Sequence, residues 1–423
     1  MSTNRVASAP RAAALIAVPF ILGAASTPAQ HVVQGELLSE WELVHDAPVG
    51  FLDRAAAVEV RGSTVFVTGA SLLQEVDGPS SYLTEAYDLA SGALLWSASY
   101  SGSPGLQNEP ADLAVTPDGA RVIVTGRSTN PAQIFLKDDI ATVAYDAATG
   151  AELWAVRYDG PTANQDQASD LAVSPDGSRV FVIGATGSAI DRDFVTLSYA
   201  VASGALAWSA TYSGTLGGND EGEAVTVSPD GARVFVSGRT SESGFSSAHT
   251  VVAYDSASGL QQWASVAPFG SGPSFLALDP AGTRLFFAGS RSTGESVLSF
   301  DPGTGTQLWV GSYSGVPRGL AVSPGGARVC VTGSVYLPWI ADDMRTRCYD
   351  GATGAELWTA DYTSPNGDPG LDEGLGVAID PSGSLVFATG RSDGPGTGAD
   401  TVTLAYDLAS GTCLLYTSPS PRD

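Results

Sequence analysis

Residues 112–126 and 139–158 read DLAVTPDGARVIVTG and DIATVAYDAATGAELWAVRY, and these two stretches decide the fold. Alternating apolar residues rich in β-branched side chains predict short strands, and the Pro-Asp-Gly and Thr-Gly segments predict tight turns between them. In the second turn, Asp146 can accept hydrogen bonds from the backbone, and Gly150 is expected to have a positive φ. The unit therefore reads as four short antiparallel strands without a helical pattern.

This unit recurs along the chain roughly every 50 residues. The other copies begin at Ala55, Asp170, Ala224, Phe275, Gly319 and Gly376. A tryptophan closes six copies, and one more lies a repeat earlier with the same neighbours; the seven are Trp41, Trp96, Trp154, Trp208, Trp263, Trp309 and Trp358. Seven such copies predict an all-β fold, a seven-bladed β-propeller of four-stranded antiparallel blades in which these tryptophans are structural wedges.

The seventh copy stops near Thr412, where its tryptophan strand is due. A propeller can close by letting its first segment complete its last blade, which also covers two exposed sheet edges. We therefore expect the strand around Trp41 to complete the seventh blade. The alternative is an eight-bladed ring whose remaining sequence is truncated at the C-terminus.

The string AYDAATGAELW at 144–154 resembles the repeat of pyrroloquinoline-quinone (PQQ)-like propellers. The AVSPDG and VFVTG half of the unit resembles bacterial secreted β-propeller repeats of the WD40-like kind. The resemblance covers about residues 38–412 and implies the fold more than a function, because such propellers have many roles. Quinoprotein dehydrogenases with this motif use a Ca²⁺–quinone site, often beside a disulfide between adjacent cysteines. This chain has no adjacent cysteine pair.

The two ends differ from the repeats. Residues 1–29 combine Arg5 and Arg11 with an apolar run at 12–25 and small residues before Gln30, which predicts a cleaved signal peptide. We therefore expect a secreted, periplasmic or cell-surface protein without a transmembrane segment in the mature chain. Residues 413–423, CLLYTSPSPRD, resemble a translated sequencing-library adapter and are expected to be an artefact. The propeller itself is assigned to residues 30–412.

Composition limits the function. The 423 residues include 20 basic and 45 acidic side chains, a formal charge of −25, and nucleic-acid phosphates repel such a protein. The three histidines, at positions 31, 45 and 249, form no metal-ligand pair, and no nucleophile elbow or phosphate loop is present. No catalytic residues are predicted, and we expect a monomer.

The variable loops place carboxylates on one face of the ring. The candidates are Glu109, Asp139, Asp193, Asp220, Glu221, Asp343, Asp372, Glu373 and Asp400; Asp166 lies in the same set of loops. Such a ring could hold Ca²⁺ or attract a cationic partner. The alternative is that these carboxylates cap strand ends and keep the protein soluble. No calcium-loop spacing is present, so Ca²⁺ is the only cofactor considered and none is firmly implied.

Two further features stand out in the sixth copy. Tyr336 and Trp339 lie in an enlarged loop of the same face, where exposed aromatic side chains would suit a sugar or a peptide. Cys330 and Cys348 fall on neighbouring strands at positions where other copies pair a large residue with a small one. We expect a cross-strand disulfide there, the alternative being two buried thiols.

These features predict an exported, non-catalytic propeller scaffold whose variable acidic face binds a protein or a glycan. The alternative function is that of a propeller enzyme, either a hydrolase or a quinone-type oxidoreductase, with Ca²⁺ on the acidic face.

Overall fold

The computed structural model describes residues 54–416 except 73–78, 103–104, 131–136, 162–164, 189–190, 216, 243–245, 269, 292–294, 337–341, 364–370 and 395–397. The expected signal peptide, the segment around Trp41 and the loop residue Trp339 lie outside the described residues. Tyr336 ends a strand, but its side chain is likewise outside the description.

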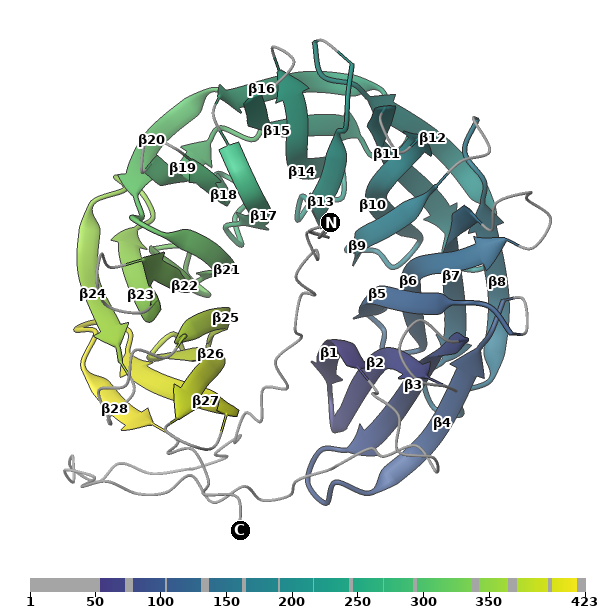
Figure 1. Cartoon of the computed structure of the whole chain (residues 1–423), viewed down its shortest axis with the longest axis horizontal. Coiled ribbons are helices and arrows are strands. Elements are labelled where there is room, and N and C mark those ends of the chain that lie inside the picture. Colours follow the sequence, from purple (N-terminus) through teal and green to yellow (C-terminus); the bar gives the residue numbers. More distant parts are fainter. Residues whose placement is uncertain are drawn as a thin grey trace, which may run out of the picture.

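Seven four-stranded antiparallel sheets follow one another around a common centre, as predicted (Figure 1). In each sheet the four strands are neighbours in chain order, with the first strand innermost and the fourth on the rim. The blades are β1–β4 (Arg54–Arg61, Thr64–Leu72, Ser80–Asp88, Leu94–Tyr100), β5–β8 (Asn108–Val115, Arg121–Asn130, Lys137–Asp146, Glu152–Tyr158), β9–β12 (Gln167–Val173, Arg179–Ser188, Asp191–Ala200, Leu206–Tyr212), β13–β16 (Glu221–Val227, Arg233–Glu242, Ser246–Asp255, Gln261–Pro268), β17–β20 (Gly270–Leu278, Leu285–Arg291, Glu295–Phe300, Gln307–Ser312), β21–β24 (Val316–Val322, Arg328–Tyr336, Asp342–Asp350, Glu356–Tyr362) and β25–β28 (Glu373–Ile379, Leu385–Gly394, Gly398–Asp407, Cys413–Tyr416). The predicted all-β, seven-bladed fold is confirmed.

The turn between the third and fourth strands has the predicted chemistry. In the second blade, Asp146 Oδ1 accepts hydrogen bonds from the Thr149 backbone N–H at 2.9 Å and from its hydroxyl at 2.8 Å. Gly150 has a φ of 71°, which glycine adopts without steric cost. The same arrangement recurs at Asp88, Asp255, Asp301, Asp350 and Asp407 in five other blades.

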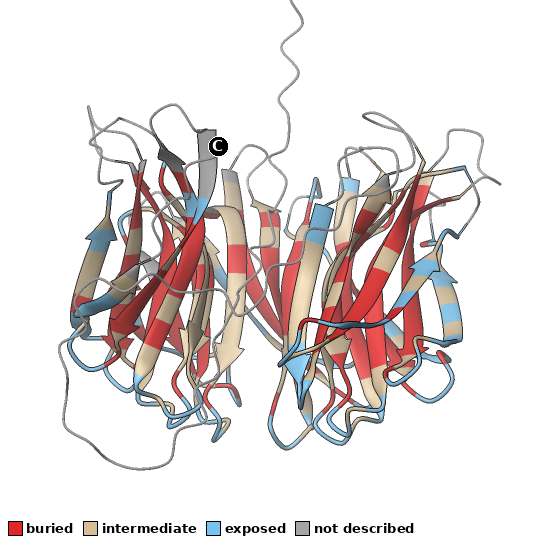
Figure 2. Ribbon diagram, turned by 90° about the horizontal axis from the view of Figure 1, so that it is seen from below, coloured by how far each residue is buried: buried red, intermediate tan, exposed pale blue. Residues whose placement is uncertain are grey.

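The apolar core lies between successive sheets, and buried residues occupy the middle of the strands (Figure 2). Each described tryptophan reaches into the next blade. Trp96 Nε1 donates to the Ala147 carbonyl at 2.9 Å, and its ring lies against Gly150, where a Cβ would come within 2.6 Å of it. The five equivalent indole bonds are Trp154 to Val201, Trp208 to Ser256, Trp263 to Pro302, Trp309 to Gly351 and Trp358 to Leu408.

The outer strand of the seventh blade differs from the expected closure. This position is held by β28, which pairs with β27, and Leu415 lies opposite Ala405 where other blades place their tryptophan. The turn at Asp407–Gly411 directs the chain outward, and the following CLLY segment supplies the apolar residues that an outer strand needs. Trp41 lies outside the described residues, so closure of the seventh blade by its segment stays a prediction, while β28 holds this position in the structure.

Candidate functional site

The two edges of the ring differ in variability. On one edge, the turns between the third and fourth strands span five residues in six blades and six residues in the fifth blade. On the other edge, the loops between the second and third strands range from two to seven residues, and those joining successive blades range from one to ten. We call these edges the turn face and the loop face. Variation is confined mainly to the loop face, where the candidate carboxylates lie.

The three candidate glutamates on the loop face form ion pairs with arginines. Glu109 contacts Arg127 at 2.8 Å, and Glu373 contacts Arg318 of the preceding blade at 3.5 Å. Glu221 pairs with Arg239 in its own blade and lies 3.6 Å from Arg192 of the preceding one. These carboxylates already have cationic partners, so they are poor candidates for metal ligands.

The aspartates that precede the innermost strands hold the inter-blade loops in place. Asp220 accepts the backbone N–H of Gly214 at 2.6 Å and that of Ser241 at 2.5 Å. Asp166 accepts the Gly160 N–H at 2.7 Å and the Thr186 hydroxyl at 2.5 Å. Asp372 occupies the same place before β25 and is buried. The structural alternative, in which these acids cap strand ends, accounts for these contacts.

The candidates at the start of the third strands differ in their surroundings. Asp139 and Asp343 are buried, and burial raises the pKa of both carboxyls. Asp193 lies opposite Thr186, and Asp400 lies opposite Ser392. The four positions are equivalent in the repeat, but they are distributed over four blades and form no common site.

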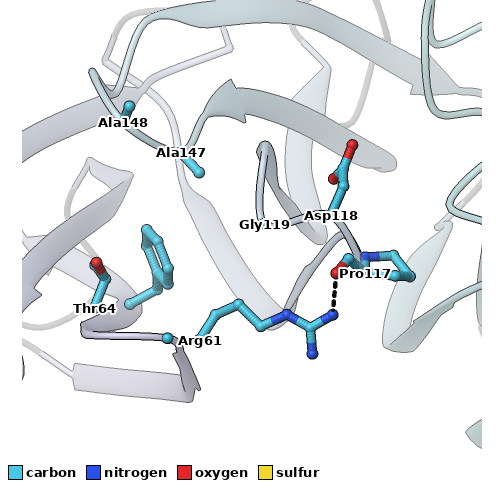
Figure 3. A pocket seen from close by; sticks show the side chains of 9 residues that line it. Arg61, Thr64, Pro117, Asp118, Gly119, Ala147 and Ala148 are labelled. Carbon is cyan, nitrogen blue, oxygen red and sulfur yellow. Dashed lines mark hydrogen bonds between the residues drawn. The ribbon is translucent and has the colours of Figure 1, made fainter.

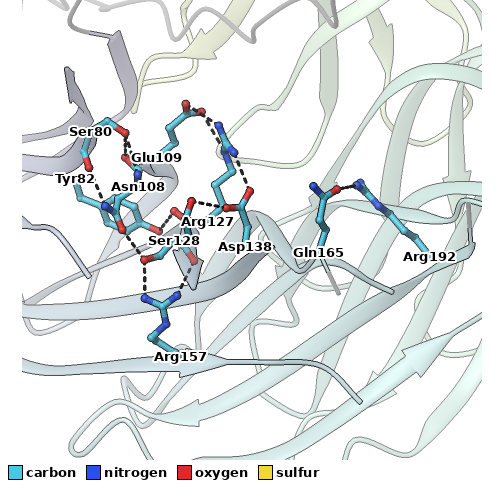
Figure 4. Close-up of polar contacts among 11 residues, drawn as sticks. Ser80, Tyr82, Asn108, Glu109, Arg127, Ser128, Asp138, Arg157, Gln165 and Arg192 are labelled. Carbon is cyan, nitrogen blue, oxygen red and sulfur yellow. Dashed lines mark hydrogen bonds and ion pairs between the residues drawn. The ribbon is translucent and has the colours of Figure 1, made fainter. Parts of the chain in front are cut away.

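A polar network joins the first two blades on the loop face, and Gln165 and Arg192 of the third blade form a separate pair beside it (Figure 4). Asn108 donates to the Ser80 carbonyl at 2.8 Å and accepts from the Ser128 hydroxyl at 2.5 Å. Arg157 donates to that hydroxyl at 2.8 Å and to the Ser128 carbonyl at 2.7 Å. Arg127 bridges Glu109 and Asp138, with 2.8 Å to each. This network positions Arg157, which also contacts Asp139 at 3.1 Å near the junction with the third blade.

At that junction three carboxylates converge. Asp139, Asp159 and Asp166 each offer one oxygen, and the three oxygens lie within 4.8 Å of one another. Asp139 and Asp166 are buried, whereas Asp159 is exposed. Burial raises the pKa of both buried carboxyls, and the charge of Asp159 contributes in each case. Asp139 and Asp166 are among the loop acids recognised in the sequence, whereas Asp159, which directly follows the outer strand β8, is not.

A second set of carboxylates, also missed, links the innermost strands. Asp112 Oδ2 accepts the Leu171 N–H of the next blade at 3.2 Å, and Asp170 Oδ2 accepts the Val225 N–H of the blade after that at 2.8 Å. Burial and the neighbouring charge of Asp170 raise the pKa of Asp112 well above its ordinary value. Glu59 and Glu223 accept backbone N–H groups of the following blades in the same way. These acids satisfy strand edges and connect blades.

The sixth blade contains a disulfide between Cys330 and Cys348, which lie opposite each other on β22 and β23. Both residues are fully buried. Cys413, in β28, is a free and exposed cysteine.

The turn face also has a pocket, of about 410 Å³, between the first and second blades (Figure 3). It arises because the first blade has a two-residue Gly62–Ser63 turn, whereas the other blades have a longer turn with a proline followed two residues later by a glycine. Elsewhere the proline of one blade packs against the turn glycine of the next, as Pro117 does near Gly177. Here Arg61 spans the space instead and donates to the Pro117 carbonyl at 2.6 Å (Figure 3). This pocket lies on the face opposite to the one where the sequence predicts binding.

Comparisons with known sequences agree with this architecture. A family model described as outer membrane protein assembly factor BamB, built on PQQ-like repeats, matches residues 80–196 and 293–413, together more than half of the chain. A family model described as a lactonase with a seven-bladed β-propeller matches residues 170–324. No curated protein matches the chain significantly in sequence.

Many solved structures have a similar fold. BamB from Moraxella catarrhalis is 16% identical, with 85% of this chain and 84% of that chain covered and a TM-score of 0.46. Quinohemoprotein alcohol dehydrogenase from Comamonas testosteroni is 13% identical, with 86% and 67% covered and a TM-score of 0.58. Sqt1 from Chaetomium thermophilum, bound to the N-terminus of ribosomal protein L10, is 15% identical, with 86% and 88% covered and a TM-score of 0.57. At these identities the likeness shows the fold alone.

Proposed function

Because the chain belongs to the BamB-type family of PQQ-like β-propeller repeat proteins, we propose that it is an exported, non-catalytic scaffold that binds a protein partner on its loop face. A single observation carries the proposal. The turns of the turn face span two to six residues and mostly five, whereas the loops of the opposite face vary from one to ten residues. Loops held by a rigid framework are where binding surfaces of such folds develop.

The remaining features support this proposal. No described helix could cross a lipid bilayer. A buried disulfide suits an oxidising compartment outside the cytoplasm. The formal charge of −25 favours a partner with a basic contact surface and an association rate that falls as salt is added.

The chemistry of the loop face supports binding more than turnover. The carboxylates there mostly accept hydrogen bonds from loop backbone or pair with arginines. His249, the one histidine in the described part of the chain, is buried against Phe287, and its Nε2 is 3.0 Å from the Ser290 carbonyl. Such groups are committed to the structure and are not presented to a substrate.

The test uses cross-linking of the purified protein with the exported-protein fraction of its source, followed by mass spectrometry. We expect cross-links from one partner to map to the loop face. Binding of that partner, then purified, should weaken by about tenfold on charge reversal of the exposed loop-face residue Asp191 by Asp191→Arg, because about 1.4 kcal/mol of favourable charge interaction is lost. The matched control, Glu152→Arg, reverses an exposed charge where β8 begins on the turn face.

Three outcomes would contradict the proposal. Cross-links confined to the turn face, or equal weakening by both variants, would remove the assignment of the loop face. Binding to a glycan array without any protein partner would leave the scaffold but replace the class of partner.

A further inference from the structure

We propose that Asp139, Asp159 and Asp166 form a calcium-binding site between the second and third blades. The three residues come from different elements: Asp139 lies in β7, Asp159 follows β8, and Asp166 precedes β9 of the next blade. One oxygen from each lies within 4.8 Å of the others. Two oxygens on opposite sides of a Ca²⁺ ion are about 4.6–5.2 Å apart, so a single ion can contact all three.

A second observation, independent of the clustering, points to a ligand. Asp139 is 98% buried, yet its Oδ1 atom has no hydrogen-bond partner among the described residues. Its other oxygen, Oδ2, accepts from Asn130 at 2.9 Å and from Arg157 Nε at 3.1 Å. A buried carboxylate oxygen without a donor or a cation is costly, and a metal ion would satisfy it.

The equivalent junctions between other blades differ from this one at the position of Asp159. Among the described blades, the residue five positions after the tryptophan is Ser101, Ser213, Ser314 or Thr363 in four and Pro268 in one, whereas the second has Asp159. Two of those junctions keep both flanking aspartates, as Asp193 with Asp220 and Asp343 with Asp372. At the second of these, the Thr363 hydroxyl hydrogen-bonds to Asp343. A hydroxyl can donate to a buried carboxylate, whereas an ionised Asp159 cannot.

The charge and the donor types select the ion. Three carboxylates with the Arg157 guanidinium give a local charge of −2, which a divalent cation neutralises. The donors are oxygens only, without histidine or cysteine, as Ca²⁺ and Mg²⁺ prefer and Zn²⁺ does not. Arg157 also donates two hydrogen bonds to Ser128, so its charge is held on the side of Asp139 Oδ2. Ca²⁺ is favoured over Mg²⁺, because Ca²⁺ accepts irregular sets of carboxylate and water oxygens whereas Mg²⁺ demands near-ideal octahedral geometry.

The site has room to exchange its ion with solvent. Asp166 is fixed by Gly160 and Thr186, and Asp139 is fixed by Arg157 and Asn130, so two ligands are positioned before the ion arrives. Asp159 is exposed, which leaves water to complete the coordination. Such a partly open, three-carboxylate site is expected to bind Ca²⁺ with a dissociation constant on the order of 10⁻⁴–10⁻³ M.

The test is calorimetric titration of the mature chain with CaCl₂, together with thermal unfolding with about 10 mM CaCl₂ or with chelator. We expect one ion per chain and a rise in Tm of roughly 2–5 °C with Ca²⁺. Asp159→Ser reproduces the residue found at equivalent junctions, so it should fold, should lose the Tm response, and should be at least as stable as the parent in chelator. The control variant Glu152→Gln removes one charge from the opposite end of β8. It should still bind Ca²⁺ and should still show the rise in Tm.

Two results would overturn the calcium proposal. Absence of Ca²⁺ binding by the parent chain up to about 10 mM would overturn the proposal, since protonation of one carboxyl would then account for the cluster. Equal Ca²⁺ responses in Asp159→Ser and the parent would also overturn it, because the ion would then bind elsewhere. Failure of partner binding does not bear on this test, which uses only the isolated chain.

Discussion

At the scale of single residues, the junctions between blades depend on glycines that accept a neighbouring tryptophan. Gly150 and Gly119 lie in the same blade, and both have a φ of 71°. They differ in what a side chain would meet: a Cβ on Gly150 would come within 2.6 Å of Trp96, whereas one on Gly119 would find its nearest atom, Arg61 Cγ, at 3.9 Å. The pair therefore separates backbone strain from loss of the tryptophan contact.

We expect Gly119→Ala to lower the free energy of unfolding by about 1 kcal/mol, because a non-glycine residue in the left-handed region costs that much. Gly150→Ala should cost about 3 kcal/mol, since the same strain is joined by a clash that displaces Trp96 from its contact. Denaturant titration monitored by tryptophan fluorescence measures both. Equal losses for the two variants would mean that the indole contact contributes little to the junction.

Single residues also mark the limit of what the sequence predicts. Asp139 and Asp166 were recognised as loop acids, but Asp159 was missed because its place beside them depends on the packing of two blades. The ion pair between Glu109 and Arg127 could not be predicted, because the two residues are 18 positions apart and only the pairing of β5 with β6 brings them together. Glu109 therefore remained a metal candidate in the sequence. Comparing the copies would have drawn attention to Asp159, because the residue five places after the tryptophan is a serine or threonine in four of them.

At the scale of the strand pair, the disulfide substitutes for a packing motif. Cys330 and Cys348 occupy positions that hold Phe235 and Ala253 in the fourth blade, where the phenylalanine contacts the blade tryptophan at a ring-centroid distance of 5.8 Å. A large residue opposite a small one is therefore replaced by two linked residues of intermediate size. Strand register explains why this pair could be predicted from sequence alone.

We expect reduction, or the double variant Cys330→Ala with Cys348→Ala, to lower the free energy of unfolding by about 3 kcal/mol, the usual effect of a bond closing a loop of this length. The double variant Cys330→Phe with Cys348→Ala copies the fourth blade and should recover part of that loss. Mass spectrometry with and without reduction establishes the bond in the parent. A free thiol at either position in the oxidised protein would contradict the expectation.

At the scale of the whole molecule, the repeat predicts the blades but not how the ring ends. Six blades dock through an indole N–H onto a carbonyl of the next blade, as Trp358 does onto Leu408. In the seventh blade Leu415 holds the tryptophan position, and a leucine has no such donor. Leu408 directly follows Asp407, and the equivalent residue of the first blade is Leu89, which directly follows Asp88. We propose that Trp41 is the native donor, because its sequence neighbours match those of the other blade tryptophans.

This proposal predicts that one change leaves the stability of the protein nearly unaffected and that another lowers it. Deleting residues 413–423 should leave the melting temperature nearly unchanged, since the Trp41 segment could then pair with β27 in place of β28. Trp41→Ala should lower the free energy of unfolding by about 3–5 kcal/mol, the usual loss for a packed tryptophan. Differential scanning calorimetry of both variants, with Leu415→Ala in the full chain as control, measures these effects. A large loss on deletion together with a silent Trp41→Ala would instead make Cys413–Tyr416 the true closing strand. In that case the adapter-like tail would be part of the protein, and the ring would close without a seventh tryptophan.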